Sequence, residues 1–172
     1  QYYWVAANSK GHGVHSPFVY QFIRQSLNGT SSFKEIVNNT PAVQNTLQAI
    51  EAASSSKLSP KIMLLIARLL ESLNPLSISV TGDKKQFEAD SSMNINVTNA
   101  SVEPIDFAFI GAGQDAATML HNANNLIGRM HSNAWVILDQ IHADADMETA
   151  WDTLKKHSNI RLSIDLFTIG IL

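Results

Sequence analysis

Residues 105–142 read IDFAFIGAGQDAATMLHNANNLIGRMHSNAWVILDQIH, and this stretch decides the fold. It begins with an apolar, aromatic run at 105–110, breaks at Gly111-Ala112-Gly113 and continues with a helical pattern. A second apolar run follows at 134–138. Two such runs joined by a helical crossover predict a β-α-β unit, which needs parallel strands with helices packed on the sheet. We therefore expect an α/β protein.

Polar residues follow both runs. Gly111 comes after the first, and Asp139 and His142 come after the second. Open α/β sheets bind their ligands at the carboxyl ends of parallel strands, so Asp139 and His142 are candidates for substrate contact or proton removal. The alternatives are a loop carboxylate that caps the next helix, for Asp139, and a surface histidine in a turn, for His142.

Three helix starts precede this unit. In each, a Ser or Thr is followed directly by Pro, at residues 16–17, 40–41 and 59–60, as is typical of an N-cap and a first helical position. Residues 52–57 (AASSSK) predict a hinge or loop. We expect an N-terminal helical cap at residues 1–57 and a sheet domain at residues 58–172.

Shorter elements flank the central unit. Thin strands are expected at 78–80 and 95–97, and a β-rich end at 161–172. Between the central unit and that end, Asp144 or Asp146 is expected to cap a helix.

Composition narrows the classes of function. The chain has 172 residues, 45% hydrophobic and 16% charged, so it can bury a sizeable core. A net charge of −3 argues against a nucleic-acid partner, because phosphate contacts require a basic surface. The absence of cysteine excludes disulfides, thiolate nucleophiles and Cys-type zinc sites. The apolar run at 62–70 is too short to span a bilayer, and no signal-peptide pattern is found, so we expect no membrane association and a cytoplasmic protein.

Two parts of the sequence resemble one protein family. Residues 12–20 (HGVHSPFVY), preceded by Tyr3-Trp4, resemble the N-terminal signature of a group of bacterial class I S-adenosylmethionine-dependent methyltransferases. The stretches 136–142 (VILDQIH), 147–151 (METAW) and 164–170 (IDLFTIG) resemble the last third of the same family.

This resemblance implies a Rossmann-like, doubly wound, mostly parallel sheet with an N-terminal helical cap. It implies S-adenosylmethionine as cofactor and an O-methyltransferase-like reaction on a small-molecule acceptor. The stretch 78–83 resembles the second strand of the family, which places Thr81, Gly82 and Asp83 against the cofactor, together with Ile110 and Gly111. Asp139 and His142 are then the catalytic candidates. No metal site is predicted, because Gly111 stands where related enzymes carry an acid.

The sequence also departs from the family. The first strand of such enzymes ends in an acidic, glycine-rich turn, whereas here Ser77 leads directly into Ile78. One alternative is a methyltransferase whose natural gene encodes further residues at this point. The other is a catalytically inactive relative that serves as a binding or assembly module. A different Rossmann-type nucleotide binder is a weaker third reading, and a homo-oligomer is compatible with all of them.

His12 and His15 belong to the N-terminal signature. They either line a substrate pocket from the cap or tie the aromatic N-terminus to the first helix.

Overall fold

The computed structural model describes residue 20 and residues 22–54, 57–82, 95–96 and 104–172. Its contacts divide the chain into two units: Gln1–Leu47 with Leu58–Asn74, and Gln48–Lys57 with Pro75–Leu172. This division differs from the boundary at residues 57 and 58 that the sequence predicts. Residues 58–74 join the helical unit, and residues 48–57 join the sheet.

The helical unit contains η1 (Phe22–Leu27), α2 (Phe33–Asn39), α4 (Pro60–Leu73) and the first part of α3 (Pro41–Ala53). Helix α4 packs against both η1 and α2. Its Arg68 guanidinium donates to the Ser31 carbonyl at 2.9 and 3.1 Å and to the Ser26 carbonyl at 3.4 Å. These carbonyls follow or end η1, so one cation on α4 fixes the neighbouring segment, which explains why α4 belongs to this unit.

The ends of α4 follow the predicted signals. The Ser59 side chain accepts a hydrogen bond from the Ile62 N–H, Pro60 takes the first helical position, and Asn74 ends the helix in the left-handed region with φ 43°. Helix α3 likewise begins at Pro41, as predicted, and the apolar side chains of Val43, Leu47 and Ile50 are buried.

Two features of this unit differ from the sequence reading. Helix α2 was not expected, although Ser32 and Glu35 form a capping box with hydrogen bonds in both directions. The segment η1 is a π-helix and not the α-helix that the signal at residues 16–17 predicts, so a 3.6-residue spacing does not apply to Phe22 and Leu27. Phe22 is buried, whereas Leu27 is 44% exposed. Residues 12–19, including His12 and His15, lie outside the described residues.

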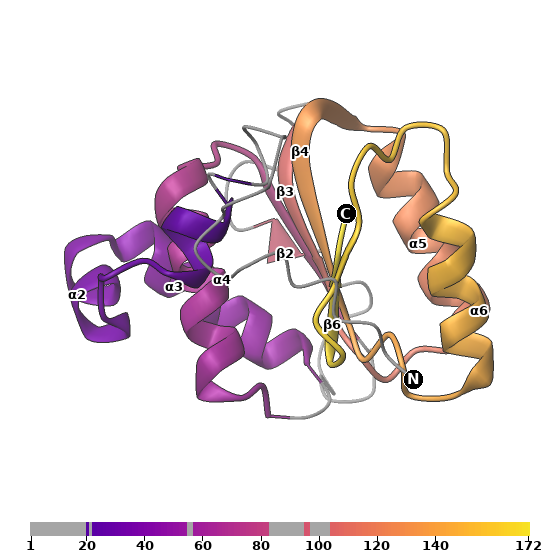
Figure 1. Ribbon diagram of the computed structural model, residues 1–172, viewed down its shortest axis with the longest axis horizontal. Coiled ribbons are helices and arrows are strands. Elements are labelled where there is room, and N and C mark those ends of the chain that lie inside the picture. The colour runs from indigo at the N-terminus through magenta and orange to yellow at the C-terminus, as the bar shows by residue number, and fades with distance from the viewer. Residues whose placement is uncertain (1–19, 21, 55–56, 83–94, 97–103) are drawn as a thin grey trace. The chain divides into compact units, whose positions relative to one another are not determined.

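The second unit is built on a sheet with strand order β2-β1-β3-β4-β6-β5. The strands are β1 (Ile78–Thr81), β2 (Ile95–Asn96), β3 (Ile105–Ile110), β4 (Met130–Asp139), β5 (Ile164–Asp165) and β6 (Ile169–Ile171). Strands β1, β3 and β4 are parallel, and β2, β6 and β5 pair antiparallel at the two sides (Figure 1). The α/β prediction is therefore confirmed, with a mixed sheet. Strand β3 has the bounds read from the sequence.

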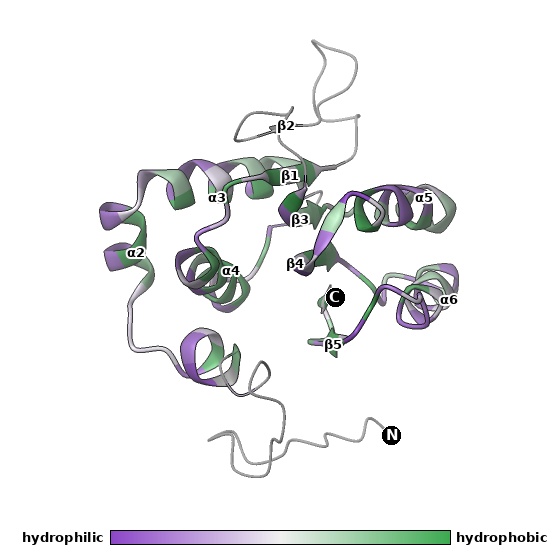
Figure 2. Ribbon diagram, turned by 90° about the horizontal axis from the view of Figure 1, so that it is seen from above, coloured by the Kyte–Doolittle hydropathy of each residue, from purple (hydrophilic) through white to green (hydrophobic). Residues whose placement is uncertain are grey.

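Helices α5 (Ala116–Ile127) and α6 (Ala145–Leu154) lie on the same side of β3 and β4 (Figure 2). Each begins at an aspartate whose carboxylate accepts a backbone N–H: Asp115 from Thr118 at 2.7 Å and Asp144 from Met147 at 2.8 Å. Buried apolar side chains of both helices and both strands form one core cluster, among them Ala108, Val136, Met119, Met147 and Trp151. Burying each large side chain of this kind contributes about 1.5–3 kcal/mol, so this cluster holds the β-α-β unit together.

Among the described residues, no helix is both long enough and apolar enough to cross a bilayer.

Candidate functional site

The carboxyl ends of the three parallel strands lie at one edge of the sheet. Thr81 is in register with Ile110, and Ile110 with Leu138, so Asp139 comes one step beyond that row. The structure therefore gathers five of the predicted site residues at this edge: Thr81, Gly82, Ile110, Gly111 and Asp139. Asp83 lies outside the described residues.

The main chain of Ala53, at the end of α3, packs against two of these positions. A Cβ placed on Gly111 would lie 2.1 Å from the Ala53 carbonyl oxygen, and one placed on Gly82 would lie 2.3 Å from the same atom. No side chain fits at such distances, so both glycines are required for this approach. The surface that the sequence assigns to a cofactor is thus covered by the chain itself.

The loop after β3 is fixed by local hydrogen bonds. The Gly111 N–H donates to the Thr81 carbonyl at 2.7 Å, which links the two strand ends. The Gln114 side chain donates to the Gly111 carbonyl at 2.9 Å and accepts from Asn122 at 2.8 Å. Gly113 has φ 94°, a conformation that favours glycine.

The side chains of Ile110 and Thr81 are also engaged. Ile110 belongs to the core cluster beneath α5 and α6, so only its main chain is at the edge. The Thr81 hydroxyl donates to the Phe109 carbonyl at 3.5 Å, a long and weak contact.

Asp139 is the buried acid of this edge. It is 2% exposed, and neither carboxylate oxygen has a hydrogen-bond partner among the described residues. The buried Ser54 hydroxyl likewise has no hydrogen bond among the described residues, although it lies near enough to Asp139 to influence its carboxylate. Burial raises the pKa of Asp139, against smaller opposing contributions from Ser54 and from the backbone N–H groups of Ala112 and Gln140. Burial of Asp139 thus makes its charged form less favourable than it is for an exposed aspartate.

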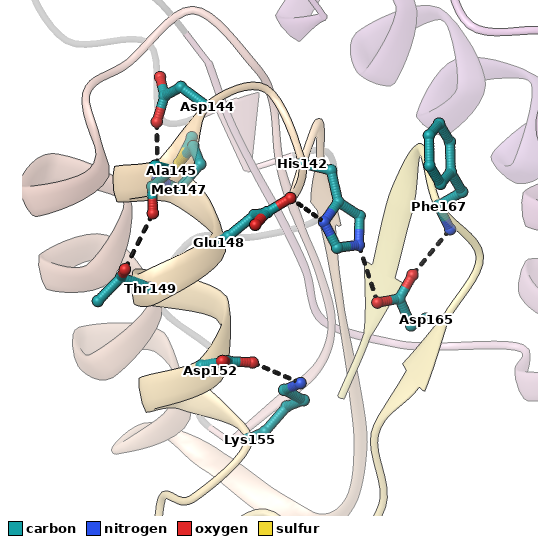
Figure 3. A network of polar contacts seen from close by, with 10 residues as sticks. All are labelled: His142, Asp144, Ala145, Met147, Glu148, Thr149, Asp152, Lys155, Asp165 and Phe167. Atoms are coloured by element: carbon teal, nitrogen blue, oxygen red, sulfur yellow. Dashed lines mark hydrogen bonds and ion pairs between the residues drawn. The ribbon is translucent and has the colours of Figure 1, made fainter. Parts of the chain in front are cut away.

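His142 occupies a different environment, shown in Figure 3. Its Nδ1 lies 2.9 Å from Glu148 Oε1 on α6, and its Nε2 lies 2.9 Å from Asp165 Oδ2 on β5. Partial burial lowers the pKa of His142, but the hydrogen bonds and charges of the two carboxylates outweigh this and raise it overall. Both ring nitrogens are thus engaged, and neither is available as a base in this arrangement.

Several of these contacts were not read from the sequence. Ser54 sits in a run of three serines, which predicts a loop but does not show which hydroxyl turns inward. Glu148 and Asp165 meet His142 only through tertiary packing, since they lie 6 and 23 residues away along the chain. The sequence does show an acidic first turn in α6, and a carboxylate there can face the loop that precedes the helix. This was the signal that could have pointed to the contact between Glu148 and His142.

The described residues contain no group of three or more His, Asp or Glu side chains arranged to hold a metal ion. Comparison of the chain with models of known protein families, with curated proteins and with solved structures found no match.

Proposed function

We propose that this protein is a Rossmann-like, S-adenosylmethionine-dependent methyltransferase that acts on a small-molecule acceptor. The strand order supports this proposal. Doubly wound dinucleotide-binding sheets have the order 3-2-1-4-5-6. The sequence resemblance makes β1 the second strand of such a sheet, β3 the fourth and β4 the fifth. We take β2 as the third strand and β5 as the sixth from their places at the two edges of the sheet.

With that assignment, the order β2-β1-β3-β4-β6-β5 is the doubly wound order without its first strand. One strand, β6, is added antiparallel between the last two. The order of the three parallel strands, β1-β3-β4, is the observation that carries the proposal, because it agrees with the second, fourth and fifth strands of the doubly wound order. The edge strand β2 differs from that order, since it pairs antiparallel with β1.

The described residues do not form a cradle for S-adenosylmethionine in this arrangement. The main chain of Ala53 lies against Gly82 and Gly111, and β1 pairs directly with β3, with no glycine-rich turn beside them. Binding of the cofactor at this edge therefore requires Ala53 to withdraw. We derive no chemical step through the cofactor.

These same contacts favour a second candidate, a catalytically inactive relative that serves as a binding or assembly module. The main chain of Ala53 covers Gly82 and Gly111, and two carboxylates hold both ring nitrogens of His142. A relative without catalytic activity can keep such contacts, because it does not need these residues to reach a substrate.

Isothermal titration calorimetry of the gene-encoded protein with S-adenosylmethionine and S-adenosylhomocysteine separates the two candidates. The methyltransferase proposal predicts saturable binding of both ligands. It also predicts that Asp83→Asn weakens binding roughly tenfold or more, through loss of a hydrogen bond to a charged group. Asp146→Asn, an exposed acid in the first turn of α6, is the matched control and should leave binding unchanged. The absence of heat at millimolar ligand would favour the inactive module.

A further inference from the structure

His142 joins three separate elements of the sheet unit. His142 follows β4, Glu148 lies in α6, and Asp165 lies in β5, the strand at one edge of the sheet. Figure 3 shows the His142 ring between the two carboxylates. Ionised carboxylates only accept hydrogen bonds, and a neutral imidazole carries a single N–H. Two contacts of 2.9 Å to two carboxylates can therefore both be hydrogen bonds only when both ring nitrogens are protonated.

The turn between β5 and β6 depends on the same group. Phe167 adopts the left-handed region with φ 68°, which is uncommon for a non-glycine residue. Its N–H donates to Asp165 Oδ1 at 2.9 Å, and its ring stacks on the His142 ring with centroids 5.6 Å apart. A positive charge on His142 thus favours the Asp165 orientation and attracts the aromatic face of Phe167 at the same time.

Within the described residues, α6 and β5 carry the charged groups identified near His142. Helix α6 contributes Glu148 and also Asp152, whose carboxylate interacts with the His142 charge and is paired with Lys155 at 2.6 Å. The charge of Lys156 also interacts with the Asp152 carboxylate. The β5–β6 hairpin contributes Asp165. The two carboxylates in direct contact are both negative, so the field at the ring favours the imidazolium.

From this geometry we propose that His142 is a pH-operated latch, which fastens the β5–β6 hairpin to α6 as an imidazolium and releases it as a neutral imidazole. The proposal does not depend on the protein being a methyltransferase.

The sign of the effect follows from the raised pKa of His142. A group whose pKa is higher in the folded state stabilises that state fully below its unfolded pKa, and the contribution is lost as the pH rises through the folded value. The latch is therefore closed in mildly acidic solution and opens as the pH rises above the ordinary range of histidine.

Release of the β5–β6 hairpin would also affect the main chain beside Asp139. Ile169 of β6 is in register with Asp139, and the Gln140 N–H donates to the Thr168 carbonyl at 2.7 Å. The hairpin turn thus supports the main chain next to Asp139. Release of the hairpin loosens that support, so the pH controls the end of β4.

Hydrogen exchange of the full chain, measured by NMR between pH 5.5 and 8.5, tests the latch. The reporters are the Leu166 and Thr168 N–H groups, which are hydrogen-bonded within the hairpin, and Met119 in α5 is the reference. We expect the protection factors of the two reporters to fall roughly fivefold relative to Met119 as His142 deprotonates, in line with the modest energy of partly exposed ion pairs.

The variants sharpen this test. His142→Gln does not titrate and should abolish the pH dependence. His131→Gln is the matched control: it breaks the other histidine–carboxylate contact, 2.8 Å to Asp106, and leaves the hairpin untouched. Glu148→Gln and Asp165→Asn should each lower the pKa of His142, followed through its ring proton shifts.

A pH-independent protection of Leu166 and Thr168 in the unmodified protein would overturn the latch, and so would the same pH dependence in His142→Gln. Should His142→Gln fail to fold, the two carboxylate variants decide. An unchanged pKa of His142 in both of them would reject the proposal.

Discussion

The close packing of Ala53 against Gly111 predicts that Gly111→Ala destabilises the protein. A Cβ at this position would lie 2.1 Å from the Ala53 carbonyl oxygen and 2.7 Å from its carbonyl carbon. Ordinary contact starts near 3.4 Å, so the end of α3 would have to withdraw by more than 1 Å. The obstructing atoms are backbone and cannot rotate away. Overpacking of this kind costs about 1–3 kcal/mol, or a melting temperature roughly 3–10 °C lower for a chain of this size.

Gly128→Ala is the matched control. Gly128 has φ −66° and ψ −17°, and the nearest atoms to an added Cβ are carbonyl oxygens at 3.6 and 3.7 Å. This substitution should stabilise the protein by about 0.4–1 kcal/mol, because it restricts the unfolded chain without strain in the folded one.

Urea denaturation followed by circular dichroism measures both variants. The prediction is a difference in the free energy of unfolding of at least about 1.5 kcal/mol between the two alanine variants, combining the two estimates above. Equal stabilities would refute the reasoning, since they would mean that Ala53 does not lie against Gly111 in solution.

Two further predictions concern single aspartates. The raised pKa of buried Asp139 means that the folded protein holds this proton more tightly, so stability falls as the pH rises above the ordinary range of aspartate; Asp139→Asn removes this dependence. Urea titrations should show that the free energy of unfolding of Asp139→Asn, relative to that of the unmodified protein, is higher at pH 7 than at pH 4. The same difference at both pH values would contradict this prediction. Asp144→Ala removes the N-cap of α6 and should cost about 0.5–2 kcal/mol, read as a lower urea midpoint with an unchanged slope. Asp146→Ala, which caps nothing, should be nearly neutral by the same assay.

The central part of the fold could be read from the sequence because local signals agree there. The run at Ile105–Ile110 is apolar except for Asp106 near its start, which indicates a strand buried on both faces, and Asp144 stands directly before the helix it caps. Helix α2 was not predicted, since it is short and its single buried side chain, Ile36, gives no periodic signal. Only the pair Ser32 and Glu35 marks it.

The candidate site was predicted in position but not in its contacts. Residues after parallel strands must meet at one edge, so Gly111 and Asp139 could be placed together from the pattern, and Thr81 was added by the family resemblance. What lies against them is set by a remote helix end, and no local pattern points from Ala53 to Gly111. The same holds for His142, whose charge state depends on Asp165, a residue brought near by the returning hairpin.

The direct pairing of β1 with β3 has a consequence for synthesis. Ile78 leaves the ribosome well before its parallel neighbour Phe107, and the intervening β2 offers only a two-residue antiparallel contact. Until β3 emerges, Ile78 and Val80 of β1 lack the parallel neighbour that they have in the folded protein, and long-range parallel pairing is slow to form. These two apolar side chains therefore wait for their partner while about thirty further residues are translated, and shielding by a chaperone is most valuable in that interval.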